Sequence, residues 1–158
     1  MLNVLDFGAS VDKLALDNQL AFNKAIEKAV SDGGGIVHVP AGKYSVSSIQ
    51  LFSNIELNLA PGAILEFSDN QEDYPVIEAR WEGATSKIYQ SLIYAKDAVN
   101  IAVTGKGILR GNGSKWWHLF RNEREQLLYP RPTTIGFDNC HDVVVRDIAI
   151  YDSPSWTV

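Results

Sequence analysis

The chain has 158 residues, which is the length of one domain large enough to bury a hydrophobic core. Its 46% of hydrophobic residues and 12 glycines are typical of a folded protein rich in turns. A net charge of −5 argues against general nucleic-acid binding.

The predicted elements begin with a short strand and one amphipathic helix. Residues 4–9 have the pattern of a strand that ends in a turn. Asp17 and Asn18 offer an N-cap, and apolar residues then follow at helical spacing until the glycines at 33–35 stop the helix. Because only strands are predicted after it, we expect the apolar face of this helix to cap the open end of a stack of strands.

Short strands punctuated by turns dominate from residue 36 onward. In residues 36–68, apolar and polar side chains alternate over a few positions, and Pro40-Ala41-Gly42 and Pro61-Gly62 interrupt the run. Alternation with a period of two between such breakers predicts strands with one buried face. The strands follow one another too closely for helices to fit between them.

A repeated unit extends this pattern along the chain. Residues 91–103 align with residues 133–145 at a constant offset of 42, and residues 53–59 repeat the second half of the unit. Such copies predict a solenoid of parallel strands whose coils stack about 4.8 Å apart. The copies are further apart than a coil requires, so we expect residues 71–90 and 112–132 to project as loops, where function is usually found.

Charge is distributed unevenly over the chain. Residues 80–131 contain nine lysines and arginines against four acidic residues, so this segment has a charge of +5 and the remainder has −10. A basic surface on an acidic protein focuses an acidic ligand, and ordinary solvated side chains give the same count. Composition alone favours neither interpretation.

Other features argue against a reactive cysteine, a metal site and a membrane-targeting segment. Cys140 is the only cysteine, and it is interpreted as a buried thiol because no paired histidine is evident. The three histidines have no metal-ligand spacing, so no metal or cofactor is expected. The N-terminus has no basic stretch and no long apolar run, so we expect no signal peptide, no membrane span and a cytoplasmic location.

Several motifs occur in one order over nearly the whole chain. Residues 4–9, 33–35 and 39–44 resemble the N-terminal cap and first coil of the pectate-lyase-like right-handed parallel β-helix superfamily. The further motifs are Leu59-Ala60-Pro61-Gly62-Ala63, Tyr74-Pro75-Val76, Arg80-Trp81-Glu82-Gly83, Leu92-Ile93-Tyr94-Ala95, Thr104-Gly105-Lys106-Gly107, Gly111-Asn112-Gly113, Trp116-Trp117, Arg131-Pro132 and Ser153-Pro154-Ser155-Trp156-Thr157. In this order they resemble the polygalacturonases of glycoside hydrolase family 28.

The resemblance implies an all-β fold, namely part of a right-handed parallel β-helix with an N-terminal capping α-helix. It implies a single domain over residues 1–158, with the cap at about residues 1–35 and the first coils at about residues 36–158. The implied function is that of a glycoside hydrolase, which cleaves galacturonan-type pectic polysaccharide with inversion. An acidic polysaccharide is therefore the expected partner, with no nucleic acid and no membrane.

The catalytic segments of that family are missing from this sequence. Family members have catalytic aspartates in an Asn-Thr-Asp segment and an Asp-Asp pair, followed by His-Gly and Arg-Ile-Lys segments, and none of these occurs here. In the family these segments follow the motif that is here Ser153–Trp156, so the chain is expected to match roughly the first third of such an enzyme. Inverting hydrolysis needs two carboxyl groups roughly 6.5 to 9.5 Å apart, and we predict no catalytic residue in this chain.

Substrate-binding residues are predicted instead. The planar guanidinium of Arg80 matches a uronate carboxylate, and tryptophans either stack on sugar faces or pack between loop and coil. Glu82 is expected to order its loop by an ion contact with Arg80. The predicted binding residues are Arg80, Trp81, Glu82, Trp116, Trp117 and Trp156.

Three hypotheses remain open: the N-terminal part of a hydrolase, a non-catalytic β-helix module that binds acidic polysaccharide, and a truncated structural fragment. A pectate lyase is less favoured because it needs clustered carboxylates for Ca²⁺, which the sequence lacks. The last coil, residues 143–158, leaves apolar side chains without cover, so we expect self-association through that end.

Overall fold

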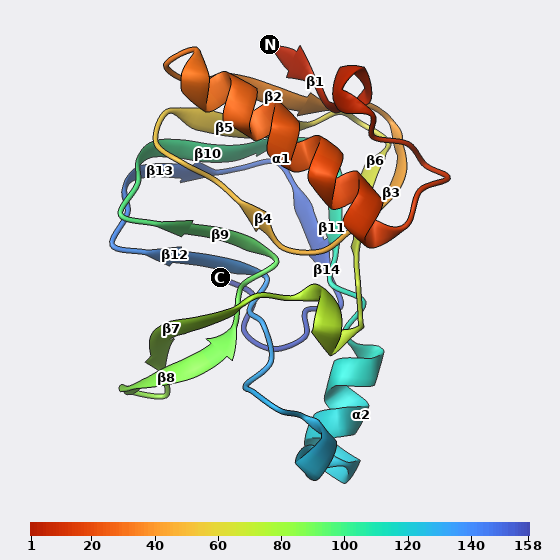
Figure 1. The fold of residues 1–158 in the computed structure, drawn as a ribbon, viewed down its shortest axis with the longest axis vertical. Helices are drawn as coiled ribbons and strands as arrows, with labels where there is room; N and C mark the ends of the chain where they lie inside the picture. The colour runs from red at the N-terminus through yellow and green to blue at the C-terminus, as the bar shows by residue number, and fades with distance from the viewer.

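Parallel strands stack in three sheets in the computed structural model, which describes residues 1–158 (Figure 1). The first sheet contains β1 (Leu2–Asn3), β2 (Gly35–Val39), β5 (Ile55–Leu59), β10 (Val99–Gly105) and β13 (His141–Val145), in that order. The second contains β3 (Gly42–Val46), β6 (Ala63–Phe67), β11 (Ile108–Arg110) and β14 (Ala149–Tyr151), and the third contains β4 (Ile49–Gln50), β9 (Ile93–Lys96) and β12 (Ile135–Asp138). Each of the first three coils therefore adds one strand to each sheet, and the last coil adds β13 and β14.

The register builds the core as columns of apolar side chains. In the first sheet Val37 pairs with Leu57, and Leu57 pairs with Val103. All three side chains have no exposed surface, because alternate residues of a strand point to the same face. Equivalent columns run through the other sheets, for example Tyr44, Leu65 and Leu109 in the second and Ile49, Ile93 and Ile135 in the third.

Helix α1 (Ala15–Ser31) lies across the first coil and covers the N-terminal end of the stack, as predicted (Figure 1). Its buried face includes Phe22, whose ring meets Tyr44 edge to face with centroids 6.4 Å apart. The predicted N-cap was wrong, because Leu14 holds that position without a side-chain bond. Asn18 lies inside the helix instead and donates to the carbonyls of Ser10 and Ser45, so it ties the helix to the coil.

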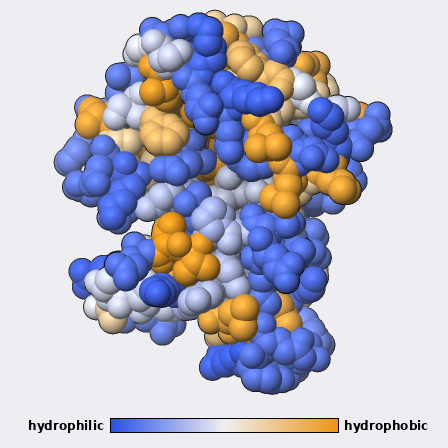
Figure 2. All heavy atoms as spheres, viewed as in Figure 1, coloured by the Kyte–Doolittle hydropathy of each residue, from blue (hydrophilic) through white to orange (hydrophobic).

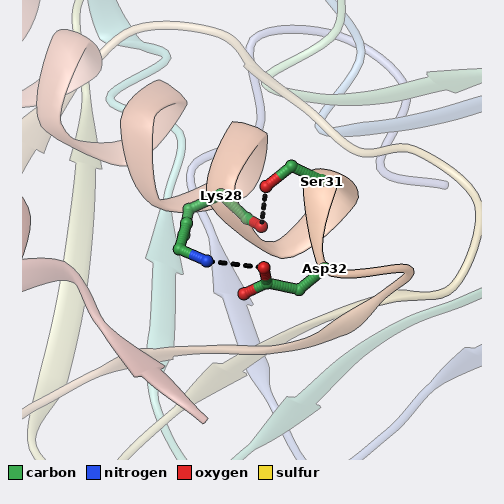
Figure 3. Close-up of polar contacts among 3 residues, drawn as sticks. All are labelled: Lys28, Ser31 and Asp32. Carbon is green, nitrogen blue, oxygen red and sulfur yellow. Dashed lines mark hydrogen bonds and ion pairs between the residues drawn. The ribbon is translucent and has the colours of Figure 1, made fainter.

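Polar contacts and glycines end this helix. Lys28 Nζ lies 2.5 Å from Asp32 Oδ1, and the Ser31 hydroxyl donates to the Lys28 carbonyl at 2.8 Å (Figure 3). Gly34 follows with φ of 125°, and a Cβ there would lie 2.6 Å from the Cβ of Asn54. Only glycine fits both the backbone conformation and the space at this turn.

Two predicted elements differ in the structure. Residues 4–9 were predicted as a strand, but β1 covers only Leu2–Asn3, and Val4–Phe7 form the 3₁₀ helix η1, whose first turn is capped by the Asn3 side chain. The chain after α1 was predicted to contain only strands, but it also forms helix α2 (Ser114–Asn122) and the short 3₁₀ helices η2 (Gln71–Asp73) and η3 (Arg124–Gln126). Both tryptophans of α2 stand in a motif that was interpreted as part of a loop.

The last coil has an uncovered edge. Strand β13 pairs with β10 on one side only, and Val143, Val144 and Val145 are 38%, 46% and 37% exposed. The helices of the structure are too short or too polar to cross a membrane.

Candidate functional site

Two insertions between the second and third sheets carry the candidate site. The first is a hairpin of β7 (Val76–Trp81) and β8 (Ala84–Tyr89), which pair antiparallel. The second contains α2, η3 and the segment that leads to β12. Both project from the same end of the stacked sheets (Figure 1), so the loops predicted at residues 71–90 and 112–132 do project, as a hairpin and a helix.

Buried aromatic rings join the two insertions to each other. Trp116 of α2 is completely buried, and its ring lies 5.6 Å from that of Tyr74 and 5.7 Å from that of Tyr89, both edge to face. Tyr89 in turn meets Tyr129 at 5.5 Å. Burial, and then the negative charges of Asp73 and Asp69, raise the pKa of Tyr74 well above its usual value. Tyr74, Tyr89 and Trp116 belong to the same hydrophobic core as the solenoid strands, and Tyr129 packs against it, so the rings extend that core into the insertions.

A cleft of about 770 Å³ opens beside these rings, with Tyr129 in its lining. Aromatic and basic side chains dominate its lining, which consists of Trp81, Glu82, Trp117, Phe120, Arg121, Arg124, Leu127, Leu128, Tyr129, Pro130, Arg131, Pro154, Ser155 and Trp156. The hairpin supplies Trp81 and Glu82, the second insertion supplies most of the rest, and the last coil supplies residues 154–156. Figure 2 shows hydrophobic atoms at the surface of the projecting insertions.

Three arginines concentrate positive charge in the cleft. The guanidinium carbons of Arg124 and Arg131 lie 4.0 Å and 3.9 Å from the centre of the Phe120 ring. Arg131 also donates to the Pro154 carbonyl at 2.9 Å, and burial followed by the charges of Arg124 and Arg121 lowers its pKa. Arginines held close together against their mutual repulsion form a site that favours an anion.

Tryptophans add flat apolar surfaces to the same cleft. Trp156 is 66% exposed, and Trp117 is half-buried, with its indole N–H donating to the Ser153 carbonyl at 2.8 Å. Trp81 is half-buried on the inner face of the hairpin. Because an aromatic ring offers a large apolar face at small entropic cost, this arrangement suits the apolar faces of a sugar ring.

The structure brings four of the six predicted binding residues into the cleft, namely Trp81, Glu82, Trp117 and Trp156. Trp116 is not available to a ligand, because it is fully buried between Tyr74 and Tyr89. Arg80 is exposed, but it alternates with Trp81 along β7 and does not line the cleft. No ion pair joins Arg80 to Glu82, which occupies the hairpin turn with φ of 48°.

Four important residues of the cleft were not singled out from the sequence, namely Phe120, Arg121, Arg124 and Arg131. The charge of +5 over residues 80–131 was the available signal, but it fitted an acidic ligand and ordinary solvated charges equally, and it did not indicate which arginines meet. Arg131 also stood in a recognised motif, Arg131-Pro132, but had no role assigned.

The cleft combines guanidinium groups with aromatic rings, but its lining does not contain two carboxyl groups. Glu82 is the one acidic residue in its lining, whereas an inverting hydrolase needs two carboxyl groups. No group of three or more histidine, cysteine or acidic side chains is arranged to hold a metal ion. The chemistry available here is charge pairing by guanidinium groups and stacking by aromatic rings.

Sequence comparisons show similarity to polygalacturonases and to a pectate lyase-like family. Residues 1–118 match the family model described as rhamnogalacturonase A/epimerase, pectate lyase-like. The chain is 33% identical over 165 residues to a probable polygalacturonase of Vitis vinifera, and 33% identical over 147 residues to an exo-poly-alpha-D-galacturonosidase of Dickeya chrysanthemi. These alignments cover 99% and 88% of this chain but only 33% and 23% of the relatives, so the chain spans about a third of their length or less.

Solved structures agree with the sequence comparisons. The fold matches a hyperthermoactive exopolygalacturonase from Thermotoga maritima with a TM-score of 0.88 and 29% identity, over 99% of this chain and 43% of that chain. It matches a family 28 exopolygalacturonase from Yersinia enterocolitica with a TM-score of 0.82 and 25% identity, over 97% of this chain and 35% of that chain. The predicted right-handed parallel β-helix is confirmed by these neighbours.

Proposed function

The chain belongs to the rhamnogalacturonase A/epimerase, pectate lyase-like family, as its motifs predicted, and we propose that it forms the N-terminal, substrate-binding part of a polygalacturonase-like glycoside hydrolase. The proposed substrate is a galacturonan-type pectic polysaccharide, which the longer enzyme hydrolyses with inversion. The observation that carries the proposal is the cleft in which three arginines and three tryptophans lie together. The similarity to polygalacturonases supports it independently.

The cleft chemistry matches a polyuronate in two respects. Each galacturonate unit has a carboxylate, which a guanidinium group binds through two parallel hydrogen bonds. Each unit also has an apolar ring face, which a tryptophan covers. Arg121 and Arg124 are exposed and free of ion pairs, so both are available to a carboxylate. A neutral polysaccharide would use only the tryptophans.

The proposed role of residues 1–158 is binding and not bond cleavage. Hydrolysis with inversion needs one carboxylic acid to protonate the leaving oxygen and one carboxylate to activate water. Glu82 alone cannot fill both roles, so we assign the catalytic pair to coils that follow Ser153–Trp156 in the longer relatives. The single acidic residue of the cleft also favours a second candidate function, a module that holds acidic polysaccharide without cutting it.

Binding to oligogalacturonate, measured by isothermal titration calorimetry, tests the proposal. We expect the chain to bind the oligomer and to bind its fully methyl-esterified form much more weakly, because esterification removes the carboxylates. Arg124→Ala should weaken binding about tenfold, the size of one charge-assisted contact. Arg146→Ala removes the same charge from the exposed last coil and should leave the affinity unchanged.

Arg80→Ala provides a second matched comparison for the cleft. Arg80 lies on the same strand as Trp81 but outside the cleft, so its removal should change the affinity much less than Arg124→Ala does. If Arg80→Ala and Arg124→Ala lose the same affinity, then binding depends on long-range charge and not on contacts in the cleft. Equal affinity for the acid and the ester would reject the proposed substrate class.

Release of reducing ends from polygalacturonate separates binding from cleavage. We expect none from the 158-residue chain, because its cleft lacks a second carboxylate. Clear turnover would place the catalytic pair within residues 1–158 and would contradict the role assigned here. A longer form of the protein that binds but releases no reducing ends would favour the second candidate function.

The uncovered edge of β13 supports one further part of the proposal, which is self-association of the 158-residue chain. The unpaired backbone groups of β13 can form hydrogen bonds with the same edge of another copy. The exposed side chains of Val143 and Val145 can pack against that copy. Sedimentation equilibrium should then show a mass that rises with concentration. A monomer at all concentrations would exclude this contact.

A further inference from the structure

One amide side chain links the two insertions. Gln71 stands at the start of η2, just before the hairpin. Its Oε1 accepts hydrogen bonds from the Tyr89 hydroxyl at 2.7 Å and from the Leu128 backbone N–H at 3.1 Å. Its Nε2 donates to the Gln126 carbonyl at 2.9 Å. Both the oxygen and the nitrogen of the amide therefore form hydrogen bonds, and their partners lie 18, 55 and 57 residues away in the sequence.

The segment that Gln71 holds is part of the cleft wall. Leu127 and Leu128 line the cleft, three and four residues after Arg124, which also lines it. The remaining backbone bonds from this segment stay within its own turn, from Gln126 N–H to Glu123 and from Leu127 N–H to Arg124. Gln71 therefore supplies the hydrogen bonds that fix residues 126–128 to the other insertion.

We propose that Gln71 is a positioning residue, which fixes residues 126–128 against the hairpin and thereby sets the spacing between the Trp81 side and the Arg124 side of the cleft. The importance of this spacing for binding rests on the proposed function. Gln71 itself does not line the cleft, so it acts on a ligand only through the wall it holds. The rings of Tyr89 and Trp116 supply the packing, and the Tyr89 backbone N–H donates to the Pro130 carbonyl at 3.2 Å, whereas Gln71 supplies the hydrogen bonds that reach residues 126–128.

The geometry requires an amide of this length. Glutamine offers an acceptor oxygen and a donor nitrogen at the same time, whereas an ionised glutamate offers acceptors only. Gln71→Glu therefore keeps acceptors for Tyr89 and Leu128 but places a carboxylate oxygen against the Gln126 carbonyl. Gln71→Ala removes all three bonds and leaves the Gln126 carbonyl and the Leu128 N–H without these partners.

The experiment combines amide exchange with ligand binding in the 158-residue protein. For Gln71→Ala we expect the Leu128 amide to exchange at least about tenfold faster by NMR, and oligogalacturonate to bind about tenfold more weakly, as expected for the loss of one or two hydrogen bonds. For Gln71→Glu we expect slow exchange at Leu128 to be partly retained. Gln126→Ala, a matched change that leaves the accepting carbonyl in place, should alter neither quantity.

A core variant separates positioning from a general loss of stability. Val46→Ala creates a cavity in the distant solenoid core and should lower the melting temperature without changing the affinity of the folded protein. Wild-type affinity in Gln71→Ala, or unchanged exchange at Leu128, would overturn the proposal. If the wild-type protein does not bind oligogalacturonate, the proposed function fails, and exchange at Leu128 still decides whether Gln71 holds the wall.

Discussion

The solenoid body and the two insertions are stabilised in different ways. In the body, parallel strands stack in register, and columns such as Val37, Leu57 and Val103 are fully buried. In the insertions, four aromatic rings and the side-chain bonds of Gln71 connect short elements that have little core of their own. The repetitive solenoid therefore supplies most of the stability, whereas the irregular insertions form the cleft and depend on a few individual residues.

The largest expected effect is in the body. Leu57→Ala removes a fully buried side chain from the middle of the first sheet, and we expect it to lower the free energy of unfolding by about 2–5 kcal/mol. Val144→Ala, in the same sheet but 46% exposed, should cost less than about 0.5 kcal/mol. Urea denaturation followed by circular dichroism measures both. Similar costs for the two variants would mean that burial in the columns does not determine the stability of the body.

The second prediction concerns the ring cluster of the insertions. Trp116→Ala should cost about 3 kcal/mol, because the indole is completely buried between Tyr74 and Tyr89. It should also abolish oligogalacturonate binding, since the cleft loses its support. Trp156→Ala changes a residue that is 66% exposed, so stability should stay within about 0.5 kcal/mol while affinity falls about fivefold, as expected for one lost stacking contact.

Thermal unfolding and calorimetry of these two variants show which tryptophan contacts the ligand and which supports the cleft. If Trp156→Ala left the affinity intact, the exposed tryptophan would not belong to the binding surface. If Trp116→Ala kept normal affinity, the cleft would not need the support of the buried ring cluster. The two tryptophans thus distinguish support of the cleft from contact with the ligand.

The body could be predicted from the sequence because its signals are local and repeated. Alternating apolar residues, the glycine and proline breakers, and the offset of 42 all follow from the strand period and from the coil repeat. The capping role of α1 followed from an apolar helical face next to a run of strands. The boundaries were less certain, since the capping bonds of Asn3 and Asn18 involve partners that the pattern does not show.

The cleft could be predicted only in part because it forms between distant segments. Arg124 and Arg131 meet on one phenylalanine ring, and no spacing rule brings these three residues together. Local geometry explains two of the errors. Neighbouring residues on a strand point to opposite faces, which separates Arg80 from Trp81, and neighbours on a helix point about 100° apart, which separates buried Trp116 from Trp117. Both stretches were predicted as loops, so this geometry could not be applied from the sequence.

The third prediction uses the buried hydroxyl of Tyr74. Burial raises its pKa above the usual value, so the folded protein keeps this proton at a pH where the unfolded chain has lost it. By linkage, this contribution to stability is complete below about pH 10 and is lost as pH rises above that value, the ordinary tyrosine pKa. Tyr74→Phe removes the bond to the Ser68 carbonyl and should cost about 1 kcal/mol at pH 7.

Urea denaturation between pH 7 and pH 11 tests the direction of this pH dependence of stability. The variant should lose less stability than the wild type above about pH 10, because one titrating group is gone. Tyr151→Phe, at an exposed tyrosine of the body, is the matched control and should leave the alkaline loss unchanged. If the free energy of unfolding falls equally with pH in the wild type and in Tyr74→Phe, then folding does not raise the pKa of Tyr74.

The smallest expected effect is on the surface of the body, at the end of α1. Lys28 and Asp32 form a close ion pair, but their side chains are 53% and 47% exposed, so water and salt screen it (Figure 3). Lys28→Ala should therefore cost only about 0.3–0.5 kcal/mol, and less in 1 M salt. Lys24→Ala, an exposed lysine of the same helix without such a partner, is the control. A salt-independent cost above about 1 kcal/mol would mean that side-chain contacts, and not buried columns alone, hold the body together, and the contrast with the insertions would weaken.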